Sequence, residues 1–230
     1  MSQATTTSVG VRCIGVTHHY PGTPSPALDD VSLTVEPGAR LAVLGRSGSG
    51  KSTLVTLLAG LHRPTKGQLL IDDVDLAAAS ERELLGLRGG VLSMVVQNPG
   101  RNLLLYGTAE DNIRFAQRSA PRSLRPSLPT PESLLGRLGL GALAGRPVAR
   151  LSGGEQQRLS IAVGLARSPG LLLLDEPTSQ LDTASRDRVL DLLATVCAST
   201  GCTVVAVTHD PAVATALGDS RTLVDGRFVA

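Results

Sequence analysis

Residues 45–52 of the chain read Gly45, Arg46, Ser47, Gly48, Ser49, Gly50, Lys51 and Ser52. This stretch fits the pattern G-x-x-x-x-G-K-[ST], and it lies between an apolar run at 40–44, typical of a buried strand, and a helical run at 53–58. The glycines permit a tight turn whose N–H groups point inward, and the helix N-terminus adds positive potential. The pattern therefore predicts a strand, a phosphate-binding loop and a helix. A glycine-rich turn that binds nothing is the plain alternative.

The side chains of this loop have distinct expected roles. We expect Lys51 to place its charge on the β- and γ-phosphates and Ser52 to offer its hydroxyl to Mg²⁺. Thr53, at the start of the helix, is assigned to the same nucleotide site. Arg46 and Ser47 are expected to contribute their backbone N–H groups.

A second motif follows at residues 171–176, which read LLLLDE. Four leucines predict a buried strand, and two carboxylates after such a strand are costly unless a cation uses them. We expect Asp175 to be a partner of Mg²⁺ and Glu176 to be the general base for an attacking water. Two solvated loop acids are the alternative. Together with the phosphate loop, the motif indicates a nucleoside triphosphate hydrolase.

A third motif at residues 151–158 reads LSGGEQQR. Ser152 and Glu155 have the spacing of a capping box, so a helix is expected to start here. Gly153 and Gly154 leave backbone N–H groups open at the positive end of that helix, which makes a second anion site. One phosphate loop already serves one nucleotide, so the second site suggests contact with a nucleotide bound by another copy. An ordinary capped helix would have the same spacing.

The order of these motifs, with LSGGEQQR between the phosphate loop and LLLLDEP, resembles the ATP-binding-cassette ATPases over about residues 9–230. The resemblance implies an α/β fold: a RecA-like P-loop NTPase core with a mostly parallel sheet, an N-terminal antiparallel β subdomain and an α-helical insert. It implies ATP and Mg²⁺ as ligands. It also implies that two copies sandwich two ATP molecules head to tail, each between the phosphate loop of one copy and residues 152–155 of the other.

Further site residues come from the resemblance alone. Gln97 matches a glutamine that senses Mg²⁺ and the attacking water and couples to a membrane partner, although a plain loop amide is possible. His209 matches a histidine that contacts the γ-phosphate, or it caps the next helix. Asp182 belongs to a loop that crosses the dimer interface, in which Gln180 replaces the usual alanine or glycine. Tyr20 matches an aromatic residue that stacks on adenine, unless its Pro/Gly-rich loop holds the ring elsewhere.

The domain organisation follows from the pattern of elements. We expect a frayed tail at 1–8 and a single domain at 9–230, with a core at 9–97 and 152–230 and a helical subdomain at 98–151. Four prolines at 121–131 predict an exposed connection, and Thr130 followed by a proline predicts a helix start. Strands and helices alternate over 171–217, and 223–229 reads as a closing hairpin, which favours a mostly parallel sheet covered by helices.

Composition limits the class of protein. The chain has 230 residues, 42% of them apolar, and a net charge of +2. We therefore expect neither a strongly positive surface for nucleic acid nor a polybasic patch for membranes.

Cys13, Cys197 and Cys202 lack metal-ligand spacing and read as small core or surface residues in a reducing compartment. His18 and His19 read as surface neighbours of a strand end, without a role. No apolar run reaches the length of a membrane helix, and the N-terminus is no secretory signal.

The predicted function is that of an ATPase subunit that powers membrane permease subunits from the cytoplasmic face of the membrane. The stretches 97–104 and 108–112 look most like the lipoprotein-release and macrolide-export type. The alternatives are an importer ATPase, or a cell-division or regulatory ATPase without cargo. Translation-type relatives usually carry two cassettes, and DNA-repair relatives carry long inserts. A pure nucleotide-binding module is disfavoured because Lys51, Asp175 and Glu176 are all present.

Overall fold

The computed structural model describes residues 8–229, without the side chains of 196–200. Its main sheet has the order β10-β9-β3-β8-β7-β6. Five of these strands run parallel: β3 (Arg40–Leu44), β6 (Leu92–Val95), β7 (Leu171–Asp175), β8 (Thr203–Thr208) and β9 (Ser220–Val224). The edge strand β10 (Arg227–Val229) is antiparallel to β9 and closes the predicted hairpin. The expectation of a mostly parallel sheet is confirmed.

The two central strands are apolar along their whole length because both of their faces are covered. All six residues of β8 are buried, as are the four leucines of β7. Leu172 and Leu174 pack on one face against α5 (Gly153–Leu165), α6 (Thr183–Thr200) and α7 (Pro211–Leu217). Leu171 and Leu173 pack on the opposite face, in the cluster that contains α1 (Lys51–Leu58).

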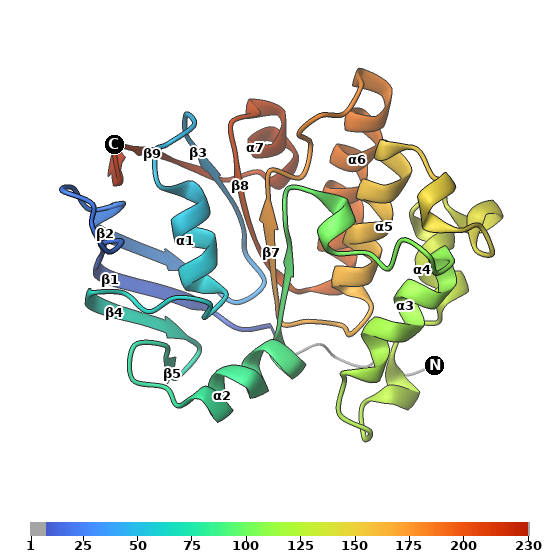
Figure 1. Ribbon diagram of the computed structural model, residues 1–230, viewed down its shortest axis with the longest axis horizontal. Coiled ribbons are helices and arrows are strands. Elements are labelled where there is room, and N and C mark those ends of the chain that lie inside the picture. Colours follow the sequence, from blue (N-terminus) through green and yellow to red (C-terminus); the bar gives the residue numbers. More distant parts are fainter. Residues whose placement is uncertain (1–7, 230) are drawn as a thin grey trace.

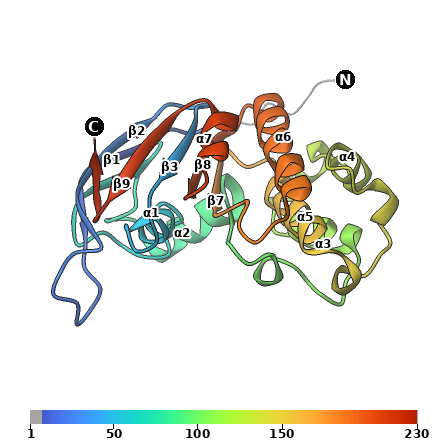
Figure 2. The same ribbon diagram turned by 90° about the horizontal axis from the view of Figure 1, so that it is seen from above.

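A second, antiparallel sheet packs on the far side of α1, so this helix lies between the two sheets (Figures 1 and 2). Its order is β2-β1-β4-β5, formed by β1 (Val11–His18), β2 (Leu28–Val35), β4 (Lys66–Ile71) and β5 (Val74–Asp75). Buried and exposed residues alternate along much of β1 and β2, as expected for strands with one face on the core. The predicted antiparallel β subdomain is therefore confirmed.

Helices dominate the segment between β5 and α5. They are α2 (Glu81–Gly86), the π-helical turn η1 (Leu87–Val91), α3 (Ala109–Arg118) and α4 (Pro131–Arg137), with short 3-10 turns η2 (Pro99–Arg101), η3 (Arg125–Ser127), η4 (Gly141–Leu143) and η5 (Val148–Arg150). Helix α4 begins where it was predicted, because the Thr130 side chain accepts a hydrogen bond from Ser133 N and a proline follows. Helices α3 and α4 lie beyond α5 on the right of both views (Figures 1 and 2). The exact limits of a subdomain at 98–151 stay a prediction.

Two expectations about single residues can be compared with the structure. His18 was expected at the surface, and this is wrong: it is 6% exposed, because its Nδ1 pairs with the Arg63 carbonyl, 45 residues away. Cys13 and Cys202 are buried, and the Cys197 side chain lies outside the described residues, as does most of the tail at 1–8. Burial raises the pKa of the Cys13 thiol to about 12.

In the described part of the chain, no helix is both long and apolar enough to cross a lipid bilayer.

Candidate active site

The predicted phosphate loop joins the end of β3 to the start of α1. Gly50 is the N-cap of α1 and has φ +101°, a left-handed conformation that only glycine adopts at little cost. A Cβ atom at Gly50 would overlap the Ala27 carbonyl oxygen. Both the backbone conformation and the available space therefore require glycine here, and the loop turns tightly enough to leave a concave surface above the helix N-terminus.

Lys51 lies across the base of this loop. Its side chain is almost fully buried, and Nζ donates hydrogen bonds to the carbonyls of Gly45, at 2.8 Å, and Arg46, at 3.0 Å. The same Nζ lies 3.6 Å from Glu176 Oε1. The ammonium group thus links the loop after β3 to the acidic end of β7.

The two carboxylates at the end of β7, those of Asp175 and Glu176, have different surroundings. Burial raises the pKa of the Asp175 carboxyl above its usual range, and the neighbouring charge of Glu176 adds to this. Lys51 and the nearby hydroxyl of Ser52 act in the opposite direction. The buried Oδ1 atom of Asp175 has no hydrogen-bond partner among the described residues. A buried acceptor of this kind is costly unless something outside the chain binds it.

Glu176 has a strained backbone and a well-connected side chain. Its φ is +49°, a rare value for a residue other than glycine, and its N–H donates to the Val207 carbonyl. Oε2 accepts hydrogen bonds from Thr208 Oγ1, at 3.1 Å, and from His209 Nδ1, at 2.9 Å. An ionised carboxylate only accepts, so in that state the ring N–H at Nδ1 of His209 donates this second bond.

Thr208 has two bonds to functional neighbours and was not singled out by the sequence. Its hydroxyl donates to Glu176 and accepts from Asp210 N, at 3.0 Å, while Asp210 Oδ2 accepts from Thr178. Thr208 is completely buried. This chain of hydrogen bonds fixes the Glu176 carboxylate relative to the end of β8.

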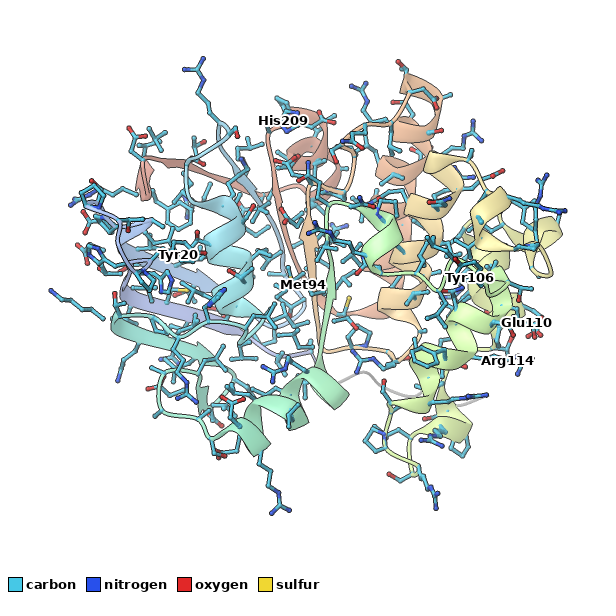
Figure 3. The ribbon with its side chains drawn as sticks, in the orientation of Figure 1. Tyr20, Met94, Tyr106, Glu110, Arg114 and His209 are labelled. Carbon is cyan, nitrogen blue, oxygen red and sulfur yellow. The ribbon has the colours of Figure 1, made fainter. Side chains whose placement is uncertain are left out.

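These groups surround a pocket of about 630 Å³. Most of the predicted loop and catalytic residues line it, namely Arg46, Ser47, Gly48, Gly50, Lys51, Ser52, Thr53, Gln97, Glu176 and His209. Ala27 also lines it and was missed by sequence reasoning, because it comes from the turn before β2 and carries no chemical signal. Figure 3 shows His209 at the end of β8, above the sheet. The pocket is large enough for a small-molecule ligand.

Tyr20 lies outside the lining of this pocket. Its ring meets His18 edge-on at 4.8 Å between centroids, and its hydroxyl is 3.3 Å from Thr53 Oγ1. Figure 3 shows it on the side of the antiparallel sheet, apart from His209. The structure therefore connects Tyr20 to the site through Thr53, and its stacking role stays a prediction.

The segment 152–155 also lies outside the pocket. Ser152 caps α5, with the reciprocal bonds of a capping box: Glu155 N donates to Ser152 Oγ, and Ser152 N donates to Glu155 Oε2 at 2.7 Å. These bonds lower the pKa of the Glu155 carboxyl. Ser152 and Gly153 are exposed, whereas a Cβ atom at Gly154 would overlap Ser185 Oγ on α6. None of residues 152–155 lines the pocket of its own chain.

Asp182 and Gln180 lie just before α6. Both carboxylate oxygens of Asp182 accept hydrogen bonds from Ser185, which lowers the pKa of the Asp182 carboxyl and caps the helix. Gln180 has φ +61°, so the residue that departs from the family pattern also occupies a left-handed conformation.

The donor atoms near Asp175 fit a hard divalent cation. Ser52, Gln97 and Asp175 offer oxygen ligands only, and Mg²⁺ prefers oxygen and keeps several of its own waters. The unpartnered Oδ1 of Asp175 is an acceptor that such an ion would satisfy. Among the described residues, no group of three or more His, Cys, Asp and Glu could enclose a metal ion.

Comparison with known proteins identifies the class. Residues 28–179 match the family model described as "ABC transporter", which is more than half of the chain. The chain therefore belongs to the ABC transporter family, and its fold and motifs define it as an ATP-binding-cassette ATPase domain. The sequence-based identification of the family is confirmed.

Three curated relatives are similar at about the same level. The lipoprotein-releasing system ATP-binding protein LolD of Anaeromyxobacter dehalogenans is 40% identical, over 96% of this chain and 92% of LolD. The methionine import ATP-binding protein MetN of Cereibacter sphaeroides is 41% identical, over 89% of this chain. The macrolide export ATP-binding/permease protein MacB of Rhodospirillum rubrum is 42% identical, over 90% of this chain. The chain spans 57% of the length of MetN and 31% of MacB.

A solved structure has the same fold. The dimeric ATP-binding cassette MJ0796, in a post-hydrolysis state bound to ADP and Pi, superposes with a TM-score of 0.83. It is 31% identical, and the match covers 96% of this chain and 97% of MJ0796. The comparison confirms the predicted fold class over nearly the whole chain.

We predict that Asp175→Asn stabilises the ligand-free protein at pH 7. Because the folded-state pKa of Asp175 is raised, its ionised form disfavours folding, so stability is lost as pH rises through that pKa. The free energy of unfolding, measured by urea titration in EDTA, should be higher for the variant at pH 7. The difference should shrink as pH falls toward about 3.9, the ordinary pKa of aspartate. The exposed Asp73→Asn serves as control, and a less stable Asp175→Asn at pH 7 would contradict the assignment.

We predict that Thr208→Val lowers kcat for ATP hydrolysis by roughly 10-fold to 100-fold, the cost of losing a hydrogen bond to a charged group. ATP affinity should stay within about twofold, because Thr208 does not line the pocket. Thr208→Ser keeps the hydroxyl and should restore most of the rate. Thr222→Val, an exposed strand position, is the matched control. A loss of ATP affinity equal to the loss of kcat would argue for a structural role only.

Proposed function

We propose that this chain hydrolyses ATP in the pocket between β3 and β7 and uses the cycle to drive a membrane partner. The observation that carries the proposal is the arrangement of Lys51, Glu176 and His209 around one pocket at the end of the main sheet. A cation, a carboxylate and an imidazole meet there next to a loop of backbone N–H groups. The cation and the N–H groups can bind a polyphosphate, and the carboxylate and the imidazole can accept or donate a proton.

In the proposed reaction, the loop N–H groups and Lys51 hold the phosphates of ATP. Glu176 would take the proton of the attacking water, and His209, which shares a hydrogen bond with Glu176, would contact the γ-phosphate. When ATP binds, before the water attacks, Lys51 would exchange its carbonyl partners at Gly45 and Arg46 for phosphate oxygens. Ser52, Asp175 and Gln97 are the proposed ligands of Mg²⁺, which would neutralise phosphate charge.

We propose further that the active form is a head-to-tail dimer. Support comes from the exposed, positively polarised end of α5 at Ser152 and Gly153, which lies outside the pocket of its own chain. In a second copy, this end would approach the γ-phosphate and complete the site. The exposed Asp182 lies in the loop proposed to cross the same interface.

The proposed partner is a set of permease subunits, with this chain at the cytoplasmic face of the membrane. We assign this ATPase to the lipoprotein-release and macrolide-export type, because the sequence at 97–104 and 108–112 resembles that type. The similarity to a methionine import protein, at 41% identity, favours an importer ATPase as the second candidate. The transported substrate would be recognised by the membrane subunits.

We predict that Glu176→Gln lowers ATP turnover by roughly 10²–10⁴-fold, the usual loss for a positioned general base. Nucleotide affinity should be retained, since the phosphate loop is untouched. Phosphate release measures the first effect and fluorescent-nucleotide titration the second. The exposed Glu36→Gln is the charge-matched control, and unchanged turnover in Glu176→Gln would rule out the base.

The same variant can identify the partner. Loaded with ATP, tagged Glu176→Gln should stay closed on its membrane subunits during gentle solubilisation, and mass spectrometry of the captured complex should find a permease. The topology of that permease would separate export from import. Recovery on soluble complexes alone would contradict the proposed membrane role.

We predict that Ser152→Arg abolishes the ATP-dependent dimer, because a bulky cation would occupy the space of the partner's γ-phosphate. Light scattering after size exclusion, in the Glu176→Gln background with ATP, measures the mass. Ser152→Ala is the control, since it removes the helix cap at a cost of about 1 kcal/mol but adds no bulk. A normal dimer of Ser152→Arg would contradict the head-to-tail arrangement.

A further inference from the structure

A second hollow, of about 250 Å³, lies between α4, α5 and α6. It shares no lining residue with the pocket at the phosphate loop. Its walls carry three arginines from three helices: Arg137 at the end of α4, Arg158 on α5 and Arg188 on α6. These helices lie together on the right of both ribbon views (Figures 1 and 2).

Arg158 is the unusual residue of this hollow. It is 6% exposed, and its buried Nε has no hydrogen-bond partner. Within the described part of the chain, no hydrogen bond or ion pair of its guanidinium is found. Burial lowers the pKa of Arg158, and the positive charge of Arg188 lowers it further. Arginine nevertheless stays charged in proteins, so this buried cation has no hydrogen-bonded counterion.

The neighbouring acids supply only part of the charge that would balance these arginines. Glu155, one turn earlier on α5, interacts electrostatically with Arg158, but its Oε2 accepts the Ser152 N–H of the capping box. Asp191 is the one acid that lines the hollow, against three arginines. Arg188 uses Nε on the Ala184 carbonyl, which leaves its terminal nitrogens free to face a ligand. The lining therefore carries an excess of two positive charges.

We propose that this hollow binds a small phosphate-type oxyanion between Arg137, Arg158 and Arg188. Guanidinium groups pair with phosphate in a bidentate geometry, and three of them on separate helices can surround a tetrahedral ion. The volume is below the range of about 300–1,000 Å³ usual for drug-sized ligands, which suits a free phosphate or the phosphate of a small monoester. Binding supplies the missing counterion of Arg158 and ties α4 to α5 and α6.

The test is a thermal-unfolding titration with inorganic phosphate against chloride at matched ionic strength. At about five times Kd, phosphate bound to the folded state raises Tm by about 2–4 °C for a chain of this size. Phosphate also binds the phosphate loop and stabilises proteins generally, so the readout is the difference between wild type and Arg188→Gln. This variant should lose at least half of the shift.

Three further variants are measured in the same titration. Arg137→Gln should lose part of the shift and does not depend on replacing a buried residue. Arg188→Lys should recover only part, since it keeps the charge without the planar fork. Arg82→Gln, an exposed arginine on α2, should respond like wild type. Equal shifts in wild type, Arg137→Gln and Arg188→Gln would overturn the proposal, because phosphate would then act elsewhere.

A second titration distinguishes the source of the phosphate. Glycerol 3-phosphate replaces inorganic phosphate under the same conditions. A larger Arg188-dependent shift with the ester identifies a small phosphomonoester as the ligand, whereas a larger shift with inorganic phosphate identifies the free ion. Absence of an Arg188-dependent shift with both probes overturns the proposal.

Discussion

The ammonium group of Lys51 is the contact on which the site depends. It bridges the carbonyls at the end of β3 and the carboxylate after β7, two strands separated in the sheet by β8. Asp175 and Glu176 follow a strand of four buried leucines, and two adjacent carboxylates in such a place require a nearby cation. Lys51 supplies that cation and also holds the loop above α1. The loop, the acids and the main sheet therefore form one electrostatic unit.

The sequence predicted the parts of the fold in which local signals agree. The apolar runs at 40–44 and 171–174 became β3 and most of β7, and Thr130 with the following proline marked the start of α4. Helix α2 was missed because it has only six residues, although Ser80 and Glu83 carry the spacing of a capping box. The burial of His18 was missed for another reason: its partner, the Arg63 carbonyl, belongs to a distant loop.

The residues of the candidate site likewise fall into those that the sequence could predict and those that only the folded structure brings together. The phosphate loop could be predicted from spacing alone because its residues are consecutive. Glu176 and His209 are 33 positions apart, and only the family resemblance related them before the structure joined them by a hydrogen bond. The supporting bonds of Thr208 and Asp210 carry no sequence pattern of their own. The three arginines of the hollow between α4, α5 and α6 likewise come from separate helices, so their proximity depends on tertiary packing.

The close contact of Gly154 with Ser185 has a mechanical consequence. It presses the first turn of α5 onto the first turn of α6, where Ser185 also holds Asp182. The N-terminus of α5 at Ser152 and the loop before α6 are thus mechanically coupled through the packing of Gly154 against Ser185. A displacement of the first turn of α5 would therefore also displace Ser185, and with it Asp182 and the loop before α6.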